Sequence, residues 1–132
     1  MKKIFILMVL LIVAACGKKD AGKITLNLKG ELPKSGEVRV EVYGYDKMLA
    51  DHKATLIVIH RENLNEKKEV VVELPEDAPD TIDPPVKDRE KASYYVTIKV
   101  TGEGENFTQD YEKNGFIEVE EDITLDVYIK KQ

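Results

Sequence analysis

Apolar and polar residues alternate with a period of two along most of this 132-residue chain, and this pattern limits the fold more than any other feature. Successive side chains of a strand point to opposite faces, so each alternating run predicts a strand with one buried face. No segment after residue 16 keeps a helical period. Five runs carry the predicted buried faces: Ile24, Leu26, Leu28; Val38, Val40, Val42; Val70, Val72, Leu74; Tyr94, Val96, Ile98, Val100; and Ile123, Leu125, Val127, Ile129.

Shorter segments add to the predicted strand set. Residues 55–59 consist of Thr55 followed by an unbroken apolar run, which is typical of a strand covered on both faces, and residues 107–111 and 116–119 are shorter candidates. Asn114-Gly115 is a strong hairpin signal. Seven or eight short strands without helices predict an all-β fold, an antiparallel β-sandwich.

The segment between residues 75 and 92 differs from the rest, because it holds four of the five prolines of the chain. Proline lacks a backbone donor and does not belong in a central strand, so the segment is predicted to be a crossover loop. Its carboxylates lack the spacing of a calcium-binding loop, which favours a solvated acidic loop. The loop is nevertheless the best candidate for partner contacts, and its candidate residues are Asp77, Asp80, Asp83 and Asp88.

The first sixteen residues point to a membrane anchor. Lys2 and Lys3 precede twelve apolar residues, and this run ends at the only cysteine, Cys16. The pattern resembles the signal peptide of a bacterial lipoprotein, with residues 13–16 similar to a lipobox, and a transmembrane helix would need about 20 apolar residues. The resemblance implies cleavage before Cys16 and a diacylglycerol on its sulfur. The predicted organisation is a signal peptide at residues 1–15, a lipidated tether at 16–22 and a β-sandwich domain at 23–132.

Charge and cysteine content exclude several classes of function. Loss of residues 1–15 removes two lysines and no acid, so the formal net charge falls from −5 to −7. A chain this acidic has no electrostatic footprint for nucleic acid. A lipidated Cys16 leaves no thiol for a disulfide or for zinc. Gly17 follows Cys16 where an aspartate would resemble an inner-membrane retention signal, so the predicted location is the periplasmic face of the outer membrane.

A series of landmarks follows in order along the mature chain: Gly30-Glu31-Leu32-Pro33, the alternating Val38, Val40 and Val42, Leu74-Pro75, Ile82-Asp83-Pro84 and the strand from Tyr94. Their order resembles a particular lipoprotein family, the type III secretion pilot lipoproteins and their uncharacterised relatives. The resemblance implies an outer-membrane-anchored β-sandwich, and it covers residues 24–129. Residues 85–93 form a charged insertion relative to the family pattern.

No motif indicates catalysis, and no cofactor or metal is expected. His52 and His60 are the only histidines, and no third ligand stands at a diagnostic spacing. The sequence therefore predicts a non-enzymatic lipoprotein, bound to the bilayer through acylated Cys16, that serves as a binding or assembly accessory for an envelope protein. The alternatives are a small-ligand carrier, an inhibitor of a wall-active enzyme and a passive structural lipoprotein.

Overall fold

The computed structural model describes residues 22–49 and 53–132. The predicted signal peptide, the lipidation site Cys16, the tether up to residue 21 and His52 lie outside this part of the chain. Gly22, predicted to end the tether, instead begins the first strand and pairs with Leu74. The strands are β1 (Gly22–Gly30), β2 (Glu37–Asp46), β3 (Thr55–Asn63), β4 (Glu69–Leu74), β5 (Ala92–Gly102), β6 (Glu105–Gln109), β7 (Glu118–Val119) and β8 (Ile123–Lys131).

Three short helical segments accompany the strands, so the expectation of a helix-free chain is wrong. They are α2 (Ala78–Thr81), the 3-10 turn η1 (Arg89–Lys91) and α3 (Tyr111–Asn114). Each is far shorter than the window in which a helical period can be recognised, which is why the sequence did not reveal them. None of the helices in the described part of the chain is long and apolar enough to cross a membrane.

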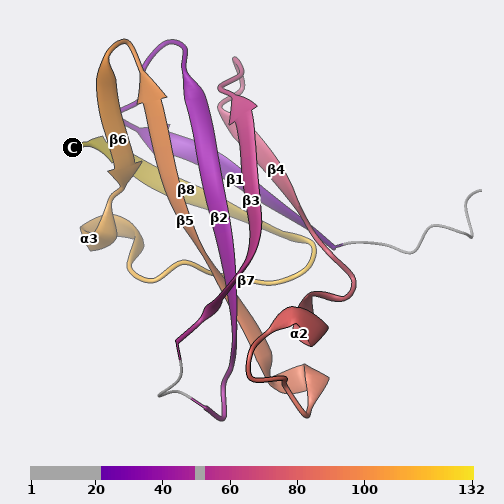
Figure 1. Cartoon of the computed structure of the whole chain (residues 1–132). Helices are drawn as coiled ribbons and strands as arrows, with labels where there is room; N and C mark the ends of the chain where they lie inside the picture. Colours follow the sequence, from indigo (N-terminus) through magenta and orange to yellow (C-terminus); the bar gives the residue numbers. More distant parts are fainter. Residues whose placement is uncertain (1–21, 50–52) are drawn as a thin grey trace, which may run out of the picture.

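All eight strands belong to one mixed sheet, which is nearly closed into a barrel (Figure 1). The strand order is β3-β2-β5-β6-β8-β1-β4, and β7 pairs with β5. The first and last strands, β1 and β8, run parallel, whereas the other pairs are antiparallel. The predicted β fold is thus confirmed, but its predicted arrangement as an antiparallel sandwich is not, because alternation specifies which face of a strand is buried and not which strand lies beside it.

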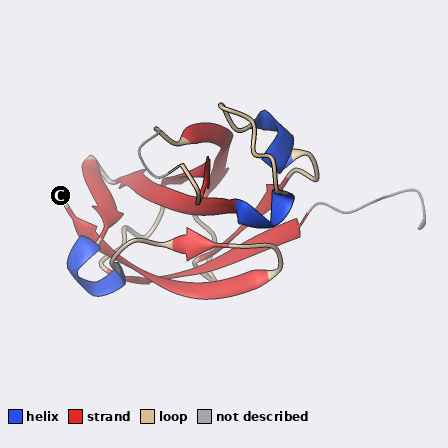
Figure 2. Cartoon of the chain, turned by 90° about the horizontal axis from the view of Figure 1, so that it is seen from below, coloured by secondary structure: helices blue, strands red, loops and turns tan. Residues whose placement is uncertain are grey.

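The interior of the curved sheet holds the predicted core. The alternating runs of β1, β2, β4 and β5 are buried as expected, and in β8 Val127 and Ile129 are buried while Ile123 and Leu125 are half-buried. Seen from below, the strands bend around this interior and the helical segments lie at its periphery (Figure 2). Alternation thus predicted the buried face of nearly every strand.

Strand β3 is the exception to that agreement. It lies at one end of the strand order, with its outer face in solvent, so the predicted strand covered on both faces is wrong. A bulge opposite Val42 and Tyr43 lets two apolar side chains three residues apart share the outer face. These are Leu56 and Ile59, which are 44% and 45% exposed.

Along one edge, β5 pairs with β6 over part of its length and with β7 over another part. Between these two partners, the backbone N–H groups of β5 donate to other acceptors. The Ile98 N–H donates to Oε1 of Gln109 at 2.6 Å, and the Val96 N–H donates to the Ile117 carbonyl at 3.1 Å. Gln109 is buried, and its side-chain oxygen accepts the hydrogen bond that a backbone carbonyl of a neighbouring strand would otherwise accept.

The segment from α3 to Gly115 does not form the predicted hairpin. Asn114 ends α3, and Gly115 follows with a φ of +66°, which favours glycine. The Asn114 side chain pairs with β8, donating to the Tyr128 carbonyl at 2.7 Å and accepting from the Tyr128 N–H at 2.8 Å. The Asn114 amide thus hydrogen-bonds to β8 as a neighbouring strand would. Asn114-Gly115 ends a helical turn and does not connect two strands of a hairpin.

The connections at the two ends of the sheet differ in length. One end, called here the turn end, carries the short connections at residues 31–36, 64–68 and 103–104. The opposite end, called the cleft end, carries the connection from β2 to β3, the crossover at residues 75–91 and the β7–β8 turn at residues 120–122. Both α2 and η1 lie in the crossover (Figure 1).

Candidate functional site

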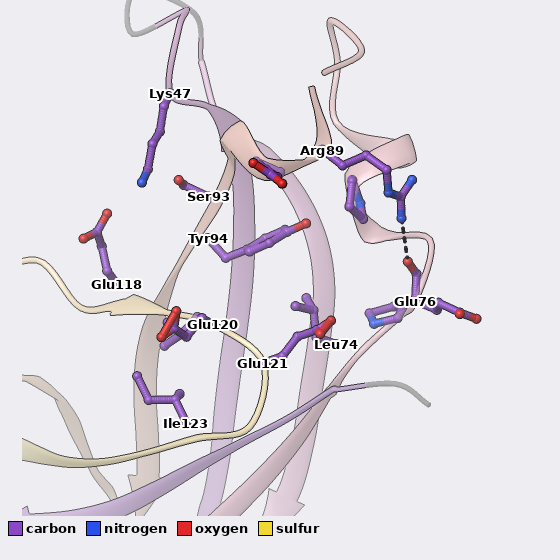
Figure 3. Close-up of a pocket in the computed structure, with 15 residues that line it drawn as sticks. Lys47, Leu74, Glu76, Arg89, Ser93, Tyr94, Glu118, Glu120, Glu121 and Ile123 are labelled. Atoms are coloured by element: carbon purple, nitrogen blue, oxygen red, sulfur yellow. Dashed lines mark hydrogen bonds between the residues drawn. The ribbon is translucent and has the colours of Figure 1, made fainter. Parts of the chain in front are cut away.

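A cleft of about 690 Å³ opens at the cleft end of the sheet (Figure 3). One wall is formed by β7 and the β7–β8 turn, and the other by the crossover. The first residues of β5 lie between the two walls. The cleft is lined by Lys47, Leu74, Pro75, Glu76, Pro79, Arg89, Glu90, Ala92, Ser93, Tyr94, Glu118, Val119, Glu120, Glu121 and Ile123.

Carboxylates dominate the charge of this cleft. Arg89, one of only two basic residues in its lining, donates to Oδ1 of Asp80 at 2.8 Å and to the Glu76 carbonyl at 3.3 Å. Within residues 22–49 and 53–132 no ion pair engages a glutamate of the lining. The surplus negative charge is therefore left for solvent or a ligand. The five glutamates are Glu76 and Glu90 on the crossover and Glu118, Glu120 and Glu121 on the opposite wall.

Tyr94 places a hydroxyl in the cleft between the two walls. Its side chain is only 9% exposed, and the ring points from β5 toward the side of Arg89 and Glu76 (Figure 3). No hydrogen bond joins this hydroxyl to another described residue. Burial raises the pKa of Tyr94, with Arg89 opposing the shift and Glu121 adding to it. The hydroxyl therefore stays protonated at neutral pH and can both donate and accept a hydrogen bond.

The cleft lies next to the start of the folded domain. A β-carbon placed on Gly22 would collide with the side chain of Glu121, so the first residue of β1 touches the acidic wall. The predicted lipidation site, Cys16, precedes Gly22 by six residues, which span at most about 20 Å when fully extended. A lipid anchor at Cys16 would keep this cleft close to the membrane surface.

The four aspartates singled out from the sequence do not act as one group. Asp80 pairs with Arg89, and Asp77 lies near both in a shallow depression shared with Glu76. Asp88 instead caps η1 by accepting from the Glu90 N–H at 3.0 Å, while the Asp83 N–H donates to Oγ1 of Thr55 at 3.0 Å. The crossover does line the cleft, but it contributes glutamates there and not these aspartates.

The glutamates of the opposite wall were missed by sequence reasoning. Glu118, Glu120 and Glu121 follow one another closely at the end of a weak strand candidate, and this acidic run was the available signal. It could be connected to the crossover only through the fold. β7 pairs with the first residues of β5, which brings the run opposite a loop about thirty residues earlier in the chain.

A second feature is an aromatic row on the outer face of the sheet. Tyr95 on β5 stacks on Tyr43 at 5.1 Å between ring centroids and contacts Phe116 at 4.7 Å. Phe116 is 61% exposed. The Tyr43 hydroxyl donates to Glu41 at 2.8 Å, and this bond is the main cause that lowers the pKa of Glu41. The row continues onto β3 through Leu56, which pairs with Tyr43.

Metal-binding geometry is not apparent in the part of the chain that the structure describes. Among residues 22–49 and 53–132, His, Cys, Asp and Glu side chains form no group of three that could hold an ion. Nε2 of His60 lies 2.7 Å from Oε1 of Glu62, and both residues are on β3.

Comparison with known proteins adds a likeness of fold. No protein-family model matches the sequence, and no curated protein sequence matches it. Among solved structures, the chain is similar to an alternative pilotin from the type II secretion system of Vibrio cholerae. The TM-score is 0.51 at 18% sequence identity, over 86% of this chain and 96% of the pilotin. The likeness to a secretion pilotin is thus confirmed at the level of the fold, while the type III family remains a prediction.

Proposed function

We propose that this protein is a lipid-anchored accessory of the bacterial envelope that binds an envelope protein, a component of a secretion system, and performs no catalysis. The observation that carries the proposal is the fold shared with a secretion pilotin along almost the whole length of both chains. The lipoprotein-like pattern ending at Cys16 supports the same reading independently, since it is a feature of the sequence and not of the fold. Its proposed location is the periplasmic face of the outer membrane.

The open edge of the sheet supplies a mechanism for recognition. β3 hydrogen-bonds to β2 on one side, and within the described residues no strand pairs with its other side. Such an edge can accept an extended segment of another protein by adding a strand, with specificity from neighbouring side chains. The exposed Leu56 and Ile59 flank this edge on the outer face, next to the aromatic row.

The rival role of a small-ligand carrier is less well supported. A volume of about 690 Å³ falls within the usual range of ligand sites, but such sites are mostly apolar. Here five glutamates line the cleft, and it contains no tryptophan.

Affinity capture from crosslinked cell envelopes tests the proposal. The native lipidated protein should recover one dominant envelope protein, and the unlipidated Cys16→Ala form should recover much less of it. A Leu56→Lys/Ile59→Lys variant should lose the same protein if β3 is the docking edge. Val71→Lys, at a 37% exposed position on β4, is the matched control and should keep it. Recovery of no dominant protein from envelopes rich in the native form would overturn the proposal.

A further inference from the structure

We propose that the segment added to β3 carries an acidic side chain opposite Arg61 and apolar side chains opposite Ile59 and Leu56. The inference rests on the proposed function, and it names the chemistry of the partner at the docking edge. The acidic side chain would be bound by three basic residues on the outer face of the sheet. This basic row consists of Arg61 on β3, Arg39 on β2 and Lys99 on β5.

The basic row crosses three neighbouring strands, β3, β2 and β5 (Figure 1). Arg39 pairs with Arg61 on one side and with Lys99 on the other. Residues directly opposite one another on one face of a sheet have β-carbons about 5 Å apart, and like charges at this spacing are destabilising. The formal net charge of the whole chain is −5, so a general excess of basic residues does not explain the row. The row therefore costs stability unless an acidic group lies beside it.

Within the described residues, the basic row is only partly neutralised. One carboxylate oxygen of Glu41 lies 2.6 Å from Nη2 of Arg39. The other oxygen of Glu41 accepts hydrogen bonds from two hydroxyl groups of the sheet, so this carboxylate is fully engaged. No ion pair among residues 22–49 and 53–132 involves Arg61 or Lys99. Three positive charges thus stand against a single carboxylate.

The guanidinium of Arg39 is a second indication that an acceptor is missing from this face. Its Nε is buried and has no hydrogen-bond partner in the described part of the chain, although buried donors are ordinarily bonded. A guanidinium can bind a carboxylate through two parallel N–H groups, and Arg39 uses only Nη2 for Glu41. The Arg39 side chain is 39% exposed, which leaves the guanidinium room to turn toward an acceptor brought to the edge.

The apolar part of the proposed pattern follows from the neighbours of Arg61 along β3. Ile59 and Leu56 share the outer face with Arg61, and they are 45% and 44% exposed. A strand added to β3 would place every second side chain beside these three residues. One acidic residue, followed by apolar residues at every second position, therefore fits the edge. The order is reversed if the added strand runs in the opposite direction.

Two other occupants of this edge fit less well than an acidic protein segment. A second copy of β3 would bring Leu56, Ile59 and Arg61 to the edge, and none of these is acidic. Lipid headgroups could supply negative charge, but Arg39 lies close to the turn end of the sheet. Gly22, next to the predicted tether, lies at the cleft end, where it pairs with Leu74. A bilayer reached through that tether would meet the cleft end first.

Fluorine NMR of labelled peptides tests the inference on the full-length lipidated protein in a non-ionic detergent, because line broadening detects weak binding. One peptide has seven residues, with glutamate at both ends, valine at the third and fifth positions and threonine elsewhere. It therefore presents the same pattern in both strand directions. The other peptide has lysine in place of glutamate. We expect the native protein to bind the glutamate peptide about fivefold more tightly, although its net charge favours the lysine peptide.

Variants at Arg61 locate that preference. Arg61→Gln should weaken binding of the glutamate peptide about three- to fivefold. Lys29→Gln is the matched control, because it removes the same charge from an exposed position on β1, and it should change the affinity by about twofold or less. Arg61→Glu should bind the lysine peptide about threefold more tightly than the native protein does, a gain that misfolding cannot produce.

Three results of the peptide experiment would overturn the inference. The first is failure of the native protein to prefer the glutamate peptide, and the second is an equal loss in Arg61→Gln and Lys29→Gln. The third is displacement of the glutamate peptide by phosphatidylglycerol added to the micelles, which would assign the basic row to lipid headgroups. Dimerisation of the purified protein that Leu56→Lys/Ile59→Lys abolishes would overturn it as well, since the edge would then hold a second copy.

The capture experiment separates this inference from the proposed function. If the native protein recovers a partner and Arg61→Glu recovers it equally well, the inference fails and the proposed function stands. If the native protein recovers no partner, the proposed function fails, and the peptides still decide whether the edge recognises this pattern. Loss of the partner from Arg61→Glu, with retention by Lys29→Gln, would support both.

Discussion

The turn end and the cleft end of the sheet are built from the same strands but are closed in different ways. At the turn end, backbone hydrogen bonds join neighbouring connections, as from the Leu64 N–H to the Gly36 carbonyl at 2.8 Å. The Lys34 N–H donates to the Glu103 carboxylate at 2.9 Å, which ties the β1–β2 connection to the β5–β6 hairpin. At the cleft end, the crossover is joined to the end of β2 by a backbone bond from the Lys47 N–H to the Lys91 carbonyl at 3.0 Å, and within itself by an exposed ion pair between Arg89 and Asp80.

The difference leaves an open space at one end of the sheet and not at the other. Short connections whose backbones touch leave no room for a ligand, and they fix the register of the strands. At the cleft end, the long crossover and the β7–β8 turn stand apart and enclose a cleft of about 690 Å³. We therefore expect substitutions to be most costly at the turn end and least costly at the cleft end.

The largest effect is expected at Gly102, where β5 enters its hairpin. A β-carbon at this position would collide with the backbone oxygen of Ser35 in the neighbouring connection, which cannot move without breaking other contacts. Gly102→Ala should lower the free energy of unfolding by about 2 to 3 kcal/mol, measured by urea denaturation of the detergent-solubilised protein.

Gly104 in the same hairpin provides the control for that prediction. A β-carbon there would meet nothing within 4 Å, and only its φ of +77° opposes substitution. Gly104→Ala should therefore cost about 1 kcal/mol. If the two variants lost the same stability, the close approach of backbones at the turn end would not be what holds it.

A smaller effect is expected between the two ends, at Asn114. Its amide donates to the Asp110 and Tyr128 carbonyls, and its oxygen accepts from the Tyr128 N–H. Asn114→Ala removes all three bonds near the surface and should cost about 1 to 2 kcal/mol. Asn114→Asp keeps only the acceptor and should lie between Ala and the native residue. Equal stability of Asn114→Ala and the native protein would show that water replaces these bonds without loss.

The strands could be predicted from the sequence because burial leaves a local signature. Alternation at residues such as Val38, Val40 and Val42 records a buried face directly, whatever the neighbouring strand. Pairing leaves no such record, and the parallel contact between β1 and β8 joins segments about a hundred residues apart. The exposure of Leu56 and Ile59 was not predicted, because an apolar run has the same sequence pattern in a strand covered on both faces and in a strand at the edge of a sheet.

The candidate site could be predicted only in part for a related reason. Proline content located the crossover, and the crossover does form one wall of the cleft. The function of its acids could not be foreseen, because Asp88 is used to cap η1 and Asp80 to hold Arg89. The opposite wall, with Glu120 and Glu121, depends on long-range pairing of β7 with β5.

The smallest effect is expected at the cleft end, where Arg89 and Asp80 join the two helical segments of the crossover. Their side chains are 56% and 66% exposed, so solvent screens the pair and its contribution should be about 0.5 kcal/mol. A double-mutant cycle of Arg89→Ala and Asp80→Asn, followed by urea denaturation, measures the coupling. A value of about 2 kcal/mol or more would mean that the crossover is held as firmly as the turn end. A value near the expected one would show that this contact can open at little cost in stability, so that the crossover depends on its hydrogen bonds to β2 and β3 for its position.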